Sequence, residues 1–405
     1  MNKAADKCTL TELPLQGIRV IELSNHLAAP TASMYLADFG ADVIKIERPG
    51  DGDELRRWGN HKDGVGLYFK VINRGKRSIT ADLRTPLGVR IVKMLVQDAD
   101  VVIENYRSGT LRKWGLDYDV LSRVNPALVM LKVTGFGQTG PYAERPGFGT
   151  LAESFTGLAH ITGEANGPPL LPAFGLGDAS TGLMGAFLMM VALRERDRSG
   201  KGQVIDLALY ETLLTLLGPQ VINYDQLGMI QQRDGSRLPF TAPRNTYRTR
   251  DDKWVVIAGS TQAVFERICV ALEVPGLATD PRFAKNHARL SNRVVLDEYL
   301  QAAVERLDFE DLMRRFEAAQ AAAAAVNDVA DVLSDPQVIA RDNVIAIRDE
   351  ELGGDVRMQN VVGKLSRTPG RIRTTGPRLG SDNRAVLIER LGLSEAELLA
   401  AGIAV

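Results

Sequence analysis

The sequence has few residues of the kinds that cross-link a fold or bind a metal. Two cysteines, Cys8 and Cys269, occur in 405 residues. They provide neither a disulfide framework nor zinc-ligand spacing. The histidines stand singly along the chain, at His26, His61, His160 and His287. None has a second ligand at metal-binding spacing, so we expect no metal site.

An excess of charge of either sign is also missing. Lysine and arginine together number 49, and aspartate and glutamate number 50, which leaves a formal net charge of −1. Such a chain has no general attraction to nucleic acid or to an anionic membrane. An anionic ligand must therefore be held by a local cluster of basic residues.

Long hydrophobic runs are absent as well. Residues 1–14 contain no apolar core of the length that a signal peptide needs. The longest apolar run, 183–193, is too short to span a bilayer and leads into charged residues. We therefore expect a cytoplasmic protein with neither a membrane nor a nucleic-acid partner.

The sequence does contain a repeated alternation of short apolar strands and helical patterns. Its 45% hydrophobic content is ordinary for a globular protein, and its length favours two domains. The expected strands are 17–23, 41–46, 99–104, 128–133 and 203–207, and the expected helices are 30–39, 85–98, 116–124 and the run from 183. This alternation predicts a doubly wound, parallel α/β domain that binds ligands at the carboxyl ends of its strands.

The pattern changes after Gly218-Pro219. A loop is followed by an expected hairpin and then by helices, over residues 246–250, 254–258, 262–272, 294–307 and 308–323. Short strands and a terminal helix come after residue 335. We therefore expect a large domain built from residues 1–224 and 331–405, and a small α+β domain over 225–330.

One stretch of small residues surrounds a lone carboxylate. In Leu171–Gly182 (LPAFGLGDASTG), Asp178 stands between Gly177 and Ala179 and just before the apolar run. Asp178 or Ser180 is then expected to be the N-cap of a buried helix. The alternative is a carboxylate left bare for a substrate, and the local sequence alone favours the cap.

Basic residues recur after successive expected strands. Arg48 follows the second strand, the loop Asn73–Arg77 (NRGKR) comes next, and Arg107 and Lys113 follow the third. Single surface cations are common, but their recurrence at strand ends predicts a groove for a ligand with several phosphates. Tyr106, beside Arg107, offers a face on which a base can stack.

A glycine motif at 135–140 (GFGQTG) matches the G-x-G-x-x-G fingerprint and follows an expected strand. A dinucleotide site requires a helix directly after it, but Pro141 and Pro146 flank a polar stretch that cannot continue as one. We therefore interpret 135–140 as a glycine loop that lets a ligand approach the backbone closely.

Several blocks taken together resemble the class III CoA-transferase family (CaiB/BaiF type), which includes formyl-CoA transferases, carnitine CoA-transferases and α-methylacyl-CoA racemases. The resemblance covers nearly the whole chain. Its blocks are 15–50 (LQGIRVIELSNHLAAPTASMYLADFGADVIKIERPG), 73–88 (NRGKRSITADLRTPLG), 99–118 (ADVVIENYRSGTLRKWGLDY), 133–149 (VTGFGQTGPYAERPGFG), 177–182 (GDASTG), 198–211 (RSGKGQVIDLALYE), 280–293 (DPRFAKNHARLSNR) and 365–370 (LSRTPG).

The resemblance implies a Rossmann-like large domain made from both ends of the chain, a small middle domain, and two chains interlinked in a dimer. A homodimer is expected, and a hetero-oligomer with a homologous chain is the alternative.

The resemblance also implies a chemistry. Asp178 matches the family's nucleophile, which takes CoA from an acyl-CoA donor as an aspartyl-CoA thioester and passes it to a carboxylic acid. Coenzyme A, as acyl-CoA, is then a substrate. The family's CoA-contacting positions match Arg48, Asn73, Lys76, Asn105, Tyr106, Arg107, Lys113, Thr134, Gly135 and Gly137.

Departures from the family pattern limit the choice of reaction. Leu27, next to His26, replaces a glutamine of formyl-CoA transferases, which argues against formyl-CoA and oxalate. His26 is either a structural residue or a substrate contact. Phe148 stands where a racemase needs a histidine, which disfavours racemase or epimerase activity. A non-catalytic CoA-binding subunit is a further alternative.

The acid substrates are less well defined by the sequence. Succinyl-CoA is a candidate donor, because a second carboxylate has several candidate cations to bind it. These cations are Arg237, Arg244 and the 57–61 loop, and surface solvation is the competing explanation for each.

Overall fold

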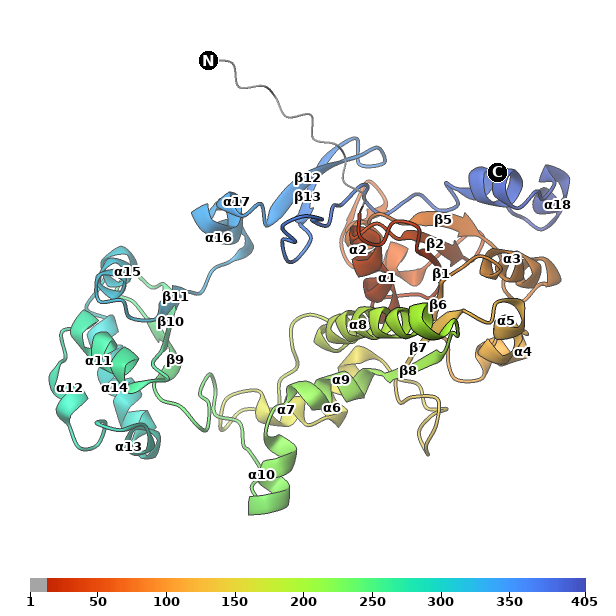
Figure 1. Ribbon diagram of the computed structural model, residues 1–405. Coiled ribbons are helices and arrows are strands. Elements are labelled where there is room, and N and C mark those ends of the chain that lie inside the picture. Colours follow the sequence, from red (N-terminus) through yellow and green to blue (C-terminus); the bar gives the residue numbers. More distant parts are fainter. Residues whose placement is uncertain (1–12) are drawn as a thin grey trace, which may run out of the picture. The chain divides into compact units, whose positions relative to one another are not determined.

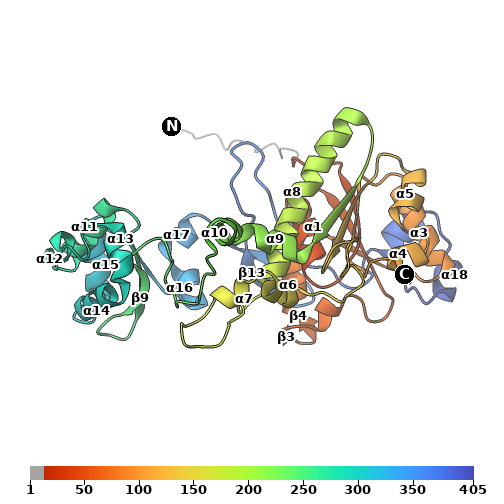
Figure 2. The same ribbon diagram turned by 90° about the horizontal axis from the view of Figure 1, so that it is seen from below.

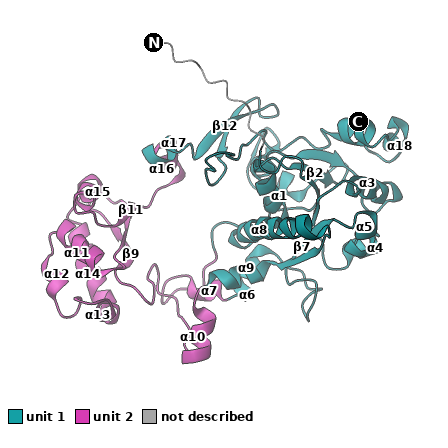
Figure 3. Cartoon of the chain, in the orientation of Figure 1, with its two compact units in different colours: residues 1–156, 172–217, 336–405 teal, residues 157–171, 218–335 magenta. Residues whose placement is uncertain are grey.

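The computed structural model describes residues 13–405, so Cys8 lies outside the described residues. The chain forms two compact units (Figure 3). Unit 1 contains the described residues up to 156, together with 172–217 and 336–405, and unit 2 contains 157–171 and 218–335. The sequence-based domain limits of 1–224, 225–330 and 331–405 remain a prediction about domains.

Unit 1 is built around a six-stranded sheet in the order β5-β2-β1-β6-β7-β8 (Figure 1). Every neighbouring pair is parallel. The strands are β1 (Arg19–Leu23), β2 (Asp42–Glu47), β5 (Arg77–Thr80), β6 (Val101–Glu104), β7 (Val129–Thr134) and β8 (Val204–Ala208). The mixed α/β class with a parallel central sheet is confirmed.

Helices cover both faces of this sheet, with α1 and α8 on one side and α3 and α5 on the other (Figures 1 and 2). Their apolar faces close the cores because parallel strands are buried on both sides. The helices of unit 1 are α1 (Ala28–Asp38), α2 (Leu67–Ile72), α3 (Pro86–Val96), α4 (Thr110–Lys113), α5 (Tyr118–Val124), α6 (Gly149–Phe155), α8 (Leu176–Ser199), α9 (Leu209–Leu216), α17 (Pro336–Ala340) and α18 (Glu395–Ala400).

Smaller elements complete unit 1. The segment after residue 336 packs with the sheet domain, where Asp382 accepts the N–H of Ser78. These elements are the 3-10 turn Glu54–Arg57, the hairpins β3 (His61–Lys62) with β4 (Val65–Gly66) and β12 (Val344–Asp349) with β13 (Gly354–Gln359), and a π-helix at Arg384–Arg390.

Unit 2 combines a three-stranded antiparallel sheet with short helices around a separate core. Its strands are β9 (Arg244–Arg248), β10 (Trp254–Ala258) and β11 (Ala323–Ala325). Its helices are α7 (Leu158–Ile161), α10 (Gln220–Leu227), α11 (Gln262–Ala271), α12 (Gly276–Thr279), α13 (Asn286–Ser291), α14 (Arg293–Val304), α15 (Phe309–Ala318) and α16 (Val329–Ser334).

The expected helix over 308–323 is wrong at its C-terminal end. Helix α15 stops at Ala318, and Ala323–Ala325 pairs as an edge strand with Val255–Ile257. Alanine favours helix only weakly, and the backbone hydrogen bonds offered by the edge of β10 outweigh that preference.

Helix α8 differs from its prediction in start and length. It begins at Leu176 with Gly175 as N-cap, so Asp178 lies in the first turn and neither Asp178 nor Ser180 is the cap. The Ser180 hydroxyl instead donates to Leu176 O. At 24 residues, α8 is long and apolar enough by length and composition to cross a bilayer, contrary to the expectation from 183–193 alone. It packs along α1, α9, β7 and β8 in unit 1.

Glycines allow α8 to lie against α1. A Cβ on Gly182 would stand 2.6 Å from Thr31 Cβ and 2.8 Å from Ala28 O, and one on Gly185 would stand 3.3 Å from Ala32 Cβ. The contacts at Gly182 leave no space for a methyl group, and those at Gly185 are tight. The packing of α1 on α8 fixes the N-terminal turn of α8 over the sheet.

We predict that Gly182→Ala lowers the free energy of unfolding by about 1–3 kcal/mol, because the added methyl must push α8 away from α1. Urea unfolding measures the change. The control is Gly354→Ala in the same unit, where no atom lies within 4 Å of the added Cβ. Equal effects of the two substitutions would contradict the role of this close approach.

Candidate active site

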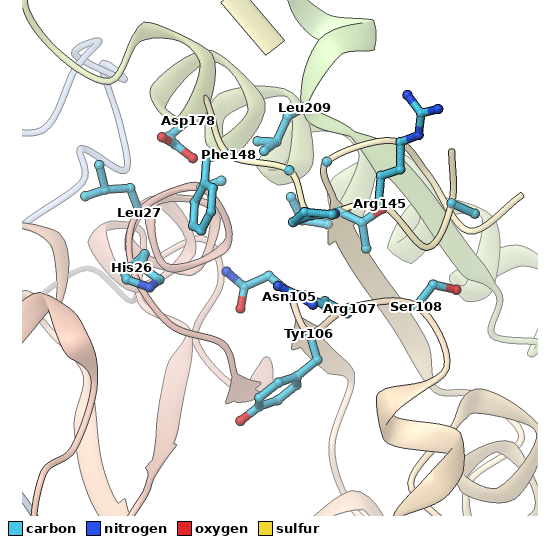
Figure 4. A pocket seen from close by; sticks show the side chains of 17 residues that line it. His26, Leu27, Asn105, Tyr106, Arg107, Ser108, Arg145, Phe148, Asp178 and Leu209 are labelled. Carbon is cyan, nitrogen blue, oxygen red and sulfur yellow. The ribbon is translucent and has the colours of Figure 1, made fainter. Parts of the chain in front are cut away.

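A cavity of about 250 Å³ lies at the carboxyl ends of the central strands of unit 1 (Figure 4). Loops after β1, β6 and β7 line it, as expected for a parallel sheet. Asp178, Phe148 and Leu27 lie at one side, and Arg145 and Ser108 lie at the other (Figure 4). From the sequence-predicted site, the cavity brings together Asp178, His26, Leu27, Asn105, Tyr106, Arg107, Thr134 and Gly135.

Asp178 reaches this cavity because glycines surround it. A side chain on Gly149, the first residue of α6, would collide with the Asp178 carboxylate. A Cβ on Gly177 would lie 2.9 Å from Gly149 O, and one on Gly175 would lie 3.4 Å from Asp178 Oδ2. Because Gly149, Gly175 and Gly177 have no side chains, none of the three covers the Asp178 carboxylate.

The charge on Asp178 is held in an unfavourable setting. Burial, followed by the negative charge of Glu153, raises the pKa of Asp178 from 3.8 to about 6, while His26 acts in the opposite direction. Among residues 13–405, no lysine or arginine forms an ion pair with Asp178. At pH 7 the side chain is still mostly a carboxylate.

Glu153 is a buried acid that sequence reasoning missed. It lies in α6, is 2% exposed, and its Oε1 accepts the N–H of Gly177 at 3.0 Å. The sequence feature that could have indicated a buried acid is one glutamate among small and apolar residues in Leu151–Phe155 (LAESF). The bond joins α6 to the residue that precedes Asp178.

The loop after β1 holds His26 in an uncommon conformation. His26 has φ of 62°, and its N–H donates to Asp53 Oδ1 at 2.9 Å. Asn105 fastens the same loop, because it accepts from Asn25 N at 2.9 Å and donates to Asn25 O at 2.7 Å. The role of Asn105 in this structure is thus to position the loop at the wall of the cavity.

Buried ion pairs support the loop from below. Lys45 lies 2.7 Å from both Glu22 Oε1 and Asp53 Oδ2, with no side-chain exposure at any of the three residues. Burial opposes ionisation, but Lys45 and Lys76 lower the pKa of Glu22 to about 2. A fully paired network of this kind is costly to break at any one member.

Lys76 and Asn73 belong to this network rather than to the cavity. Lys76 Nζ lies 2.8 Å from Glu22 Oε2 and 2.9 Å from Asn73 Oδ1, and both side chains are buried. Burial lowers the pKa of Lys76 to about 8. The structure therefore does not bring these two predicted CoA-contacting side chains to the site.

A cluster of aromatic side chains lies near Asp178, and the sequence analysis did not predict it. The His26 ring meets Trp58 and Phe148 edge to face, each at 6.4 Å between ring centroids. Trp58 stacks on Tyr68 at 6.2 Å, and burial together with the charge of Asp178 raises the pKa of Tyr68. These contacts come from segments far apart in sequence, so no local pattern signalled them.

A second cavity of about 230 Å³ shares Tyr106 with the first. Arg48 and Arg84 line it, and Arg48 pairs with Asp51 at 2.6 Å on the surface. The two cavities suit a long ligand whose anionic end meets arginines. Two other predicted CoA-contacting residues, Lys113 and Gly137, line neither cavity. Lys113 is exposed, and the Gly137 N–H donates to Thr134 Oγ1 at 2.9 Å.

The candidate cations for a second carboxylate lie elsewhere. Arg237 pairs with Asp297 at 2.6 Å and with Asp234 at 3.1 Å within unit 2. Arg244 donates to Ser236 O, also within unit 2. In the 57–61 loop, Arg57 donates to Asp51 O and His61 lies 3.1 Å from Arg56 O. None of these lines the cavity of Asp178, whereas Arg145, which sequence reasoning missed, does.

Metal ligands do not gather in the part of the chain that the structure describes. Residues 13–405 contain no group of three histidine, cysteine, aspartate or glutamate side chains placed to hold an ion. The buried Cys269 lies in the core of unit 2.

Fold and site together define a parallel α/β protein that presents a largely buried carboxylate without a lysine or arginine partner, among residues 13–405, at the strand ends. The chain belongs to CoA-transferase family III, whose family model matches residues 15–383. It is an enzyme that transfers CoA, and CoA thioesters are its substrates. The resemblance inferred from the sequence blocks is confirmed.

Relatives cover nearly the full length of the chain. Succinyl-CoA–D-citramalate CoA-transferase of Chloroflexus aurantiacus is 43% identical over 95% of this chain and 96% of its own. The beta subunit of succinyl-CoA–L-malate CoA-transferase from the same organism is 42% identical over 96% of this chain and 97% of its own. A CaiB/BaiF family protein from Brucella suis has a similar structure, with a TM-score of 0.83 and 37% identity over 93% of this chain and 99% of that one.

We predict that Asp178→Asn stabilises the protein at pH 8 by about 1–2 kcal/mol, a figure reduced for partial exposure of the side chain. The raised pKa means that the folded state binds more protons than the unfolded state between about pH 4 and 6. Stability is therefore lost as the pH rises through this range, and the amide removes that loss. Urea unfolding tests this, and the gain must shrink from pH 8 to pH 5. A gain independent of pH would contradict an ionisation effect.

Proposed function

We propose that the enzyme moves CoA from succinyl-CoA to a carboxylic acid through a thioester on Asp178. The observation that carries this proposal is the setting of the Asp178 carboxylate, which is ringed by glycines, faces a cavity at the strand ends and has no lysine or arginine ion pair among residues 13–405. A carboxylate that is ionised at pH 7 needs no general base to act as a nucleophile.

The exchange proceeds by four substitutions at carbonyl carbons. An Asp178 oxygen attacks the donor thioester, the C–S bond breaks, and CoA leaves as thiolate with a mixed anhydride on the enzyme. The thiolate then attacks the Asp178 carbonyl carbon, and the donor acid leaves as a carboxylate. The acceptor carboxylate attacks the aspartyl-CoA thioester and expels the thiolate. This thiolate finally attacks the acceptor carbonyl, which frees Asp178 and the new acyl-CoA.

Oxyanions form at each tetrahedral stage and need hydrogen-bond donors. The backbone N–H groups of Gly135 and Asp178 are candidates, since both residues line the same cavity, whereas those of Gly137 and Gly177 already have acceptors. The small neighbours of Asp178 leave room for the thioester.

The CoA moiety is proposed to lie along the two cavities that share Tyr106. Arg107 lines the first cavity, and Arg48 and Arg84 line the second, so these arginines are candidate partners of the phosphates. Tyr106 supplies an aromatic surface between them. Asn73 and Lys76 are left out of this proposal because their side chains are bound inside the fold.

Succinyl-CoA is proposed as the donor because it appears in the names of the similar D-citramalate and L-malate transferases. Arg145 also lines the cavity of Asp178 and, with Arg107 assigned to the phosphates, is the candidate cation there for a second carboxylate. An acyl-CoA racemase is disfavoured, because Phe148 beside Asp178 has no proton to exchange.

Assembly is part of the same proposal. Exposed apolar side chains on α8 (Leu183, Phe187 and Val191) support an interlinked homodimer. The similarity to a named beta subunit keeps a hetero-oligomer with a homologous chain as the alternative.

We predict that Asp178→Ala folds and still binds CoA but transfers it at less than about a thousandth of the wild-type rate, because the nucleophile is gone. Succinyl-CoA is offered with a panel of acids, and acyl-CoA products are read by mass spectrometry. Asp225→Ala, an exposed acid on α10, serves as the control. Undiminished transfer by Asp178→Ala would show that another group carries the acyl transfer.

A further inference from the structure

We propose that Glu153 is a positioning residue whose negative charge drives Asp178 toward its thioester form. This rests on the proposed role of Asp178 as nucleophile. The two carboxylates repel each other while both are free, and the repulsion disappears once Asp178 is bonded to CoA.

The geometry holds Glu153 in place beside Asp178. Glu153 is 2% exposed, and its Oε1 receives the Gly177 N–H at 3.0 Å. Gly149, one turn earlier in α6, touches the Asp178 carboxylate so closely that a Cβ would collide with it. Helix α6 also packs against both α8 and α9. Glu153 therefore cannot swing away from Asp178 without disturbing these contacts.

The charge of Glu153 is not neutralised by a salt bridge. Within residues 13–405 no lysine, arginine or histidine lies at ion-pair distance from it, and its hydrogen bond comes from a backbone N–H. Burying a carboxylate without a cation is costly, and proteins keep such groups mainly where they do chemistry. A glutamine would accept the same N–H without that cost, so hydrogen bonding alone does not explain a glutamate.

Other charges packed against α8 have partners of their own. His26 is the opposing influence on Asp178, and Tyr68 is the further titratable group that senses its charge. The remaining groups are bound locally, namely Asp38 on α1 to Arg74, Lys132 on β7 to Asp117, Asp206 on β8 to Gln138 N, and Glu211 on α9 to Ala208 N. Glu153 is thus the acid that acts on Asp178 from the packed elements.

The reaction moves the negative charge out of the site. Before transfer, the free carboxylate of Asp178 lies beside the side chain of Glu153. After transfer, Asp178 is a neutral thioester and the charge leaves with the released donor acid. Lost repulsion favours the thioester, and a more basic Asp178 is a stronger nucleophile in the first step.

The test measures the thioester equilibrium directly. Wild type and Glu153→Gln are mixed with succinyl-CoA and graded succinate without acceptor at pH 7, and intact-protein mass spectrometry gives the fraction carrying CoA. We expect Glu153→Gln to lower the equilibrium constant for thioester formation about tenfold. The acid limb of its kcat/KM profile shifts down by about one pH unit, from near pH 6.

Two further variants separate charge from structure. Glu153→Asp keeps the charge but shortens the reach to Gly177, so the charge account predicts an acid limb near that of wild type. Glu211→Gln removes a carboxylate on the neighbouring α9 that accepts the Ala208 N–H at 3.0 Å. It should change neither the thioester equilibrium constant nor the acid limb of the kcat/KM profile.

The outcomes distinguish the two proposals. A wild-type enzyme that forms no CoA adduct on Asp178 overturns the proposed function, and the role of Glu153 falls with it. If the wild type forms the adduct but Glu153→Gln has the same thioester equilibrium constant and the same kcat/KM pH profile, only the role of Glu153 is overturned. If Glu153→Asp lowers the thioester equilibrium constant and shifts the acid limb as much as Glu153→Gln does, the role of Glu153 is to hold Gly177, and the charge account is also overturned.

Discussion

The contact between the start of α6 and the first turn of α8 is the constraint on which the site depends. Gly149 and Gly177 let the two backbones meet, and Glu153 ties them by its bond to Gly177 N. Because these glycines have no side chains, the Asp178 carboxylate packs closely against the backbone and still lines the cavity. The same closeness places two acids together, so the fold carries a built-in repulsion at its reactive group.

The rest of unit 1 keeps this arrangement in place. Helix α8 is held to α1 through Gly182 and Gly185, and the loop bearing His26 is held by Asp53 and Asn105. Beneath that loop, opposite charges at Glu22, Lys45, Asp53 and Lys76 satisfy each other out of water. The contrast is informative, since charges that serve the fold are paired whereas the charges of Asp178 and Glu153 are not. Unpaired charge at a functional site typically lowers stability in exchange for reactivity.

Much of this arrangement was predictable from local sequence, and the failures have physical causes. The strand–helix alternation predicted the parallel sheet, and small residues around Asp178 marked it as unusual. The burial of Lys76 was not foreseen, because its partner Glu22 lies far away in sequence and a surface cation and a buried cation look alike in the sequence. The cap was misplaced because Gly175 starts the helix through its backbone, which leaves no side-chain signal. Glu153, Trp58 and Tyr68 reach the site only through tertiary contacts.

The most direct test of the account follows an oxygen atom into Asp178. The acceptor acid is supplied with ¹⁸O in its carboxylate, turnover with succinyl-CoA is allowed to proceed, and the peptide containing Asp178 is examined by tandem mass spectrometry. Attack of the acceptor on an aspartyl-CoA thioester leaves one labelled oxygen on the regenerated carboxylate, so the account predicts ¹⁸O at Asp178. Labelled oxygen in the released succinate with none in Asp178 would show direct transfer between the two acids and would contradict the account.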